Sequence, residues 1–190
     1  MSDLHNKVKL FVQHPLYIGN ALQKLQSRLM EDIGHSVAQS KRHDVTEHLK
    51  SLPSSIKSEA GKMAVHFVAF YCLENYIRQV IEDMLIETHG VEWWPDKIPS
   101  EIVKLANKTQ ESEIASGVTI RSERMLDYLT FGQLSEVIKF NWKDCFEIIF
   151  SDLNAVQRIM SDLNRLRGPI AHCCLLPDDE IGRLELAVKD

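Results

Sequence analysis

An arginine and a histidine flank a Gly-Pro pair near the end of the sequence, in RLRGPIAHCC at residues 165–174. Arg167 carries a permanent charge, whereas His172 has the type of side chain that titrates near neutral pH. The run before them contains arginine but no lysine, and planar guanidinium groups donate two parallel hydrogen bonds to phosphate oxygens. Two interpretations follow: the segment is the ordinary end of a helix, or it is an active site that binds phosphate.

The Gly168-Pro169 pair predicts a break in the helix that precedes it. In an unbroken helix, residues five apart differ by about 140° around the axis, so Arg167 and His172 would not share a face. Pro169 lacks the amide that would bond back to Arg165, and its ring clashes with that turn. Gly168 tolerates whatever backbone results. We therefore expect a break that directs Arg167 and His172 into a common cleft.

No other motif indicates enzyme chemistry. The sequence contains no glycine-rich phosphate loop, no H-E-x-x-H motif and no nucleophile elbow. Its cysteines form no C-x-x-C pair and no His/Cys zinc spacing; they are Cys72, Cys145, Cys173 and Cys174. We expect four free thiols, no metal and no cofactor.

The charge and hydropathy of the chain argue against two broad classes of protein. A net charge of −5 and a pI of about 5.9 are unlike those of proteins that coat nucleic acid non-specifically, but they leave room for a local basic groove. No apolar run approaches the roughly 20 residues of a membrane span, and the N-terminus has no signal-peptide apolar block. With free thiols suited to a reducing compartment, this predicts a cytoplasmic protein that does not contact membranes.

Helical spacing of apolar residues recurs along the chain, whereas the alternation typical of strands is almost absent. We predict an all-α bundle of four to six helices. In the first region, apolar residues at helical intervals predict an amphipathic helix; they are Leu22, Leu25, Leu29 and Ile33. Residues 50–61, which contain Pro, Ser and Gly, predict a connector.

The longest helical signal covers residues 63–90, with Gly90 as the expected stop. Glu74 and Arg78 fall together on one flank of its apolar stripe. The spacing by itself predicts an i,i+4 ion pair worth about 0.2–0.5 kcal/mol. The alternative is that the pair belongs to a functional site.

The second half of the sequence predicts further helices, which lie at residues 99–113, 123–151, 154–166 and after Pro177. Thr130 followed by Gln133 matches a capping box at the start of one of them. Trp93 and Trp94 could form a base-stacking platform or a hydrophobic plug that caps the bundle. We predict the plug.

The segment LNRLRGPIAH resembles the signature of the HEPN superfamily (higher eukaryotes and prokaryotes nucleotide-binding domains). In that signature an Arg is followed four to six residues later by a His at the end of a late helix. Other stretches resemble one branch, the Swt-type HEPN domain; they are YCLENYIRQVIEDML with WW soon after, LDYLTFGQLSEVIKFNW and DDEIGRLEL. The likeness covers residues 63–190. We expect a HEPN-type helical bundle at residues 56–190 and an N-terminal helical extension at residues 1–55.

The resemblance implies catalytic roles for Arg167 and His172, which match the two motif positions. Auxiliary or RNA-binding roles are implied for four further residues: Glu74, Arg78, Asn164 and Arg165. The position after the motif arginine is commonly Asn or another polar residue in the family, whereas this sequence has Gly168. This difference removes a side chain that could form hydrogen bonds.

The activity that the resemblance implies is metal-independent RNA cleavage. Neutral His172 would take the proton from a ribose 2′-hydroxyl, and Arg167 would stabilise charge on the phosphoryl oxygens as the freed oxygen attacks. Gly168 and the acidic pI favour a second hypothesis, a catalytically inactive HEPN module that binds RNA, a nucleotide or a protein. A helical scaffold unrelated to nucleic acid is the third.

The resemblance also implies partners. It predicts RNA as the substrate and a homodimer in which motif residues of two chains line one cleft. A two-fold axis would place two copies of Arg167 and of His172 in that cleft. Many family members act in toxin–antitoxin or phage-defence systems, which implies an antitoxin or another regulatory protein as a further partner.

Overall fold

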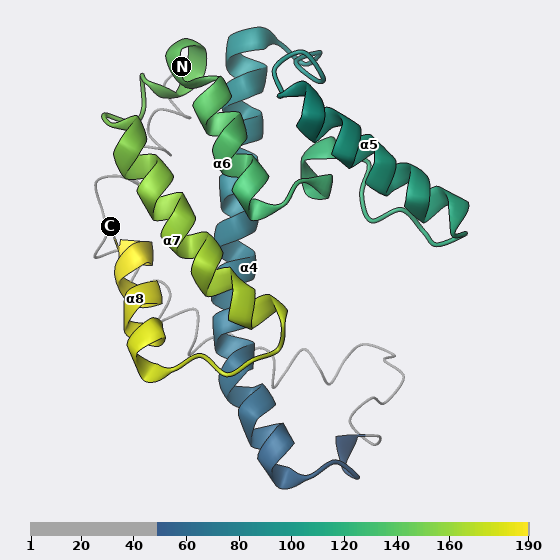
Figure 1. The fold of residues 1–190 in the computed structure, drawn as a ribbon, viewed down its shortest axis with the longest axis vertical. Coiled ribbons are helices and arrows are strands. Elements are labelled where there is room, and N and C mark those ends of the chain that lie inside the picture. The colour runs from purple at the N-terminus through teal and green to yellow at the C-terminus, as the bar shows by residue number, and fades with distance from the viewer. Residues whose placement is uncertain (1–48, 190) are drawn as a thin grey trace. The chain divides into compact units, whose positions relative to one another are not determined.

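The computed structural model describes residues 49–189, and every regular element in this range is helical (Figure 1). The α-helices are α4 (Ser54–His89), α5 (Ser100–Ala115), α6 (Phe131–Phe140), α7 (Leu153–Ala171) and α8 (Asp178–Lys189). Two short helical turns complete the set, a 3-10 turn η1 (Met125–Tyr128) and a π-helical turn η2 (Trp142–Phe146). The predicted all-α fold is confirmed for these residues.

The predicted amphipathic helix lies outside the described residues, as does most of the proposed N-terminal extension; its apolar positions are Leu22, Leu25, Leu29 and Ile33. None of the helices within residues 49–189 is long and apolar enough to cross a membrane.

Helix α4 begins earlier than the sequence predicted. Residues 50–61 were expected to form a connector, but the helix starts at Ser54, and the carbonyl of Pro53 already accepts a hydrogen bond from the Lys57 N–H at 3.2 Å. Proline and serine are compatible with the start of a helix, where the first N–H groups have no helical acceptor. The predicted stop is confirmed, because Gly90 follows the last helical residue with φ of +82°, a conformation that glycine adopts readily.

The described residues form two compact units, one of residues 72–165 and one of residues 49–71 and 166–189. The first unit has an apolar core whose largest fully buried side chains are Ile81, Leu85, Leu126, Phe131, Leu134, Val137, Cys145 and Phe146. The second unit buries Phe70, Leu166, Ile170, Leu176 and Leu184. Burial of one such aliphatic or aromatic side chain stabilises a fold by about 1.5–3 kcal/mol.

Local signals in the sequence locate several helix starts correctly. Thr130 accepts a hydrogen bond from the Gln133 N–H at 3.4 Å, and the Gln133 side chain accepts one from the Thr130 N–H at 2.7 Å. This is the predicted capping box, at the start of α6. Helix α5 begins after Pro99, and α8 begins after Pro177, both as predicted.

The tryptophan pair before α5 packs as the plug that the sequence predicted. Trp93 is only 7% exposed, and its ring meets that of Trp94 edge-on, with 5.8 Å between centroids. An edge-to-face arrangement is favourable for two aromatic rings within a core. A buried ring cannot offer its face to a base, so the stacking-platform hypothesis is not supported for Trp93.

Candidate functional site

The predicted helix break at Gly168-Pro169 is wrong, because α7 continues through both residues to Ala171. The N–H of His172 still donates to the Gly168 carbonyl at 3.0 Å. Proline therefore removes a single hydrogen bond, the one that would reach the Arg165 carbonyl. One missing bond in the last turn is too small a loss to end this helix.

The helix ends instead at Cys173, which adopts a left-handed conformation with φ of +56°. The Cys173 N–H donates to the Ile170 carbonyl at 3.3 Å, and the Cys174 N–H donates to the Pro169 carbonyl at 2.9 Å. These two bonds around a left-handed residue form a Schellman motif. The chain thus closes α7 with a cysteine at the position where glycine is usual.

The continuous helix changes the expected geometry of Arg167 and His172. Their positions differ by about 140° around the axis of a regular helix, so α7 does not direct both side chains to one side. Arg167 is half-buried and makes interactions of its own. His172 is exposed at the end of the helix. The expected common cleft within one chain is therefore not formed by a break in α7.

Gly168 lies between these two residues in helical backbone. A Cβ atom added there would meet no atom within 4 Å. The position therefore does not require glycine for close packing, and a Cβ atom fits there.

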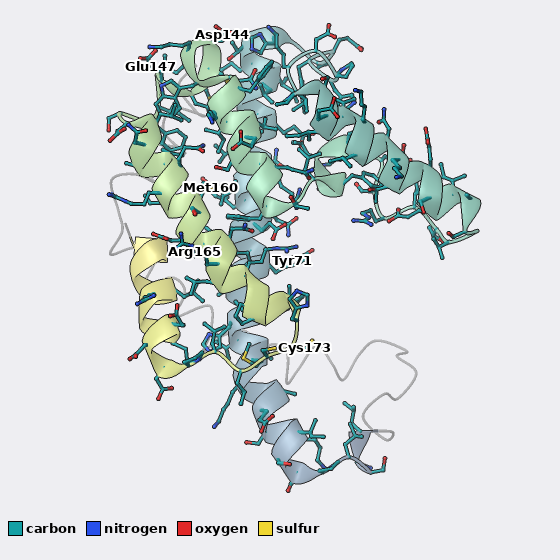
Figure 2. All side chains as sticks on the ribbon, viewed as in Figure 1. Tyr71, Asp144, Glu147, Met160, Arg165 and Cys173 are labelled. Carbon is teal, nitrogen blue, oxygen red and sulfur yellow. The ribbon has the colours of Figure 1, made fainter. Side chains whose placement is uncertain are left out.

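Asn164 and Arg165 lie one turn earlier on α7 and are both exposed. The side-chain amide of Asn164 packs over Gly132 near the start of α6, since a Cβ at Gly132 would lie 3.6 Å from its Nδ2. The Arg165 side chain is 79% exposed and lies 3.8 Å from an Asp162 carboxylate oxygen. Figure 2 labels Arg165 on α7. Both side chains are accessible to a ligand.

Glu74 and Arg78 form the predicted ion pair on α4, with 2.5 Å between Glu74 Oε1 and Arg78 Nη2. The pair is buried, at 14% and 8% side-chain exposure. Arg78 also donates to the carbonyl of Leu126 and, at 2.9 Å, to that of Leu129. The guanidinium group therefore holds the segment around η1 against α4, a contact across about 50 residues that no spacing rule in the sequence could reveal.

Two shifted pKa values lie elsewhere in the first unit. A hydrogen bond from Arg121 lowers the pKa of Glu113, and this pair holds the loop after α5. Burial raises the pKa of the Cys145 thiol. All four cysteines are free thiols, and the described residues contain no group of three or more His, Cys, Asp or Glu side chains that could hold a metal ion.

The comparison with protein families gives one match. The model of the Swt1-like HEPN family matches residues 68–190. Searches of curated proteins and of solved structures found no match. The matched range covers about two thirds of the chain and includes the all-α elements from the middle of α4 through α8. The chain therefore belongs to the Swt1-like HEPN family.

Proposed function

We propose that this protein is an endoribonuclease that cleaves RNA by attack of a ribose 2′-hydroxyl on the adjacent phosphate. His172 accepts the proton of the 2′-hydroxyl, the 2′-oxygen bonds to phosphorus, and the 5′-oxygen leaves and takes up a proton. Arg167 stabilises the negative charge that develops on the phosphoryl oxygens. The products are a 2′,3′-cyclic phosphate and a 5′-hydroxyl.

The observation that carries this proposal is family membership over residues 68–190, together with the exposed imidazole at the end of α7. HEPN domains commonly have ribonuclease activity. A general base must reach the proton that it abstracts, and His172 is accessible from solvent. The Schellman motif fixes the backbone on both sides of it.

The direction of the two side chains favours a site shared between two chains. Because α7 separates Arg167 and His172 by about 140°, a cleft lined by both groups needs a second surface. A homodimer with α7 near the two-fold axis supplies one, since each chain contributes an arginine and a histidine. Light scattering should give a mass of about 44 kDa, twice the chain mass of 21.8 kDa. Cleavage by a 22 kDa species would contradict the shared cleft.

The decisive experiment compares the parent protein with His172→Ala on RNA in the presence of EDTA. We expect the parent to cut RNA and leave cyclic phosphate ends, and the variant to lose at least about a hundredfold in rate, the usual contribution of a general base. His89→Ala serves as a control, since it removes a histidine that lies in the last turn of α4 and outside the motif. Equal cleavage by His172→Ala, or loss of cleavage with EDTA, would refute the mechanism.

Gly168 and the net charge of −5 favour a second function, an inactive module that binds RNA, a nucleotide or a protein partner. The open space around Gly168 allows a direct test with Gly168→Asn. If the parent binds RNA without cutting it and Gly168→Asn gains cleavage, the missing side chain accounts for the inactivity. Growth arrest on expression of the parent, relieved by His172→Ala, would instead support a toxin that an antitoxin restrains.

A further inference from the structure

Helix α7 carries two arginines on one face, and both lie within the first compact unit. Arg158 and Arg165 are seven residues apart, so they differ by only about 20° around the axis and lie about 10.5 Å apart along it. The two arginine side chains therefore follow one line along the helix.

This line faces solvent. Arg158, Ser161 and Arg165 are exposed, whereas Met160, Leu163 and Leu166 on the other side of α7 are 3–5% exposed. Figure 2 labels Met160 and Arg165 on the helix. Arg158 makes no hydrogen bond or ion pair to the part of the chain that the structure describes. Within residues 49–189, the ion pair given for Arg165 is the 3.8 Å contact to Asp162, which is longer than a hydrogen bond.

The stability of the fold does not explain these arginines. Exposed ion pairs contribute little, and Arg158 lacks even such a pair within residues 49–189. Helix α7 carries Arg158, Arg165 and Arg167 against Asp162, a balance of three positive charges and one negative, in a chain whose net charge is −5. A basic line without lysine on an acidic protein fits forked recognition of phosphate oxygens.

We propose that Arg158 and Arg165 bind two backbone phosphates of one single RNA strand. The inference rests on the proposed function for the identity of the strand as RNA, and it adds a phosphate-binding track along α7. Phosphate contacts of this kind position a strand without reading its sequence. Arg158 and Arg165 are thus binding residues, and the bond-breaking step needs neither of them.

The test measures binding separately from cleavage. A fluorescent 2′-O-methyl RNA, which lacks the attacking hydroxyl, is titrated with the parent and with Arg158→Gln/Arg165→Gln at several salt concentrations. Loss of two phosphate contacts should lower the slope of log K against log salt by about 1.4, which corresponds to binding about 25-fold weaker at 0.1 M salt. On cleavable RNA, KM should rise while kcat stays near that of the parent.

Two further variants sharpen the interpretation. Lys104→Gln/Lys108→Gln removes the same charge from the exposed face of α5 and should leave binding unchanged. Arg158→Lys/Arg165→Lys keeps the charge but removes the fork, and should restore the salt slope with only part of the affinity.

Each outcome separates this inference from the function on which it rests. If the parent cleaves RNA and the double Gln variant binds as tightly as the parent, the track is refuted and the nuclease stands. If the parent binds RNA through both arginines but never cuts it, the track stands and the nuclease is refuted. If the parent binds no RNA, both are overturned. If the arginines are needed only to bind an acidic polymer such as poly-glutamate, the track is refuted and the nuclease is decided by the cleavage assay.

Discussion

Arg78 offers the sharpest test of how this fold is held together. Its guanidinium group is buried, donates to the carbonyls of Leu126 and Leu129, and pairs with Glu74. In Arg78→Met, the partly buried Glu74 carboxylate loses the guanidinium group that pairs with it, and loss of one member of a buried ion pair costs about 3–5 kcal/mol. We therefore expect the free energy of unfolding to fall by about 4 kcal/mol, a drop in Tm of about 8–16 °C for a chain of this size.

Urea and thermal unfolding followed by far-UV circular dichroism measure the effect. Lys104→Met is the matched control, because Lys104 forms an ion pair with Glu101 at 2.7 Å in which the two side chains are 69% and 78% exposed. Exposed pairs contribute about 0.2–1 kcal/mol, so this variant should unfold almost as the parent does. The two pairs have similar lengths and differ mainly in burial.

A second variant separates the charge from the carbonyl contacts. Glu74→Leu/Arg78→Met removes both charges of the pair, so neither is left behind without the other, and loss of the hydrogen bonds to the carbonyls near η1 costs about 2 kcal/mol. The double variant should therefore be more stable than Arg78→Met alone. If Arg78→Met and Lys104→Met are equally stable, or if the double variant is the least stable, the reasoning fails.

Three further predictions concern single positions. Gly168→Ala should raise the free energy of unfolding by about 0.4–1 kcal/mol in chemical denaturation, since helical Gly168 has open space for a Cβ. Asn141→Ala should lower it by about 2 kcal/mol, because buried Asn141 donates to two backbone carbonyls; an unchanged midpoint would contradict this. Burial raises the pKa of Cys145 above its usual value of 9.0, so its contribution to stability is present below about pH 9 and is lost as pH rises further. Cys145→Ala should then lose less stability than the parent on going to alkaline pH, and a thiol reagent should modify native Cys145 last of the four cysteines.

The sequence was informative wherever a local rule decides the backbone. The capping box at Thr130, the glycine stop at Gly90 and the start of α5 after Pro99 each depend on groups within four residues. Such signals give element type and boundaries without knowledge of tertiary contacts. They were confirmed for this reason.

The sequence was uninformative where several weak preferences compete. Pro169 signals a break, but the loss of one hydrogen bond was outweighed by the bonds that close the turn at Cys173. Arg78 donates to the Leu126 and Leu129 carbonyls because the tertiary structure brings them together. The i,i+4 spacing of Glu74 and Arg78 in the sequence gives no sign of these contacts. The expectation that Arg167 and His172 point into a common cleft depended on the predicted break at Pro169. It was wrong with that break, because a continuous helix directs the two side chains to different sides.

Pro169 within α7 has a consequence for the exchange of backbone amides. The last turn of the helix depends on the N–H groups of His172, Cys173 and Cys174, and Pro169 contributes none. Such a turn can open locally at a free energy below that of global unfolding, and its amides should exchange with solvent deuterium sooner than those beside buried Met160. If RNA binds His172 only while the Schellman motif is formed, bound RNA would suppress this local opening. Slowed exchange at the end of α7 would therefore report occupancy of the site even when no bond is cut.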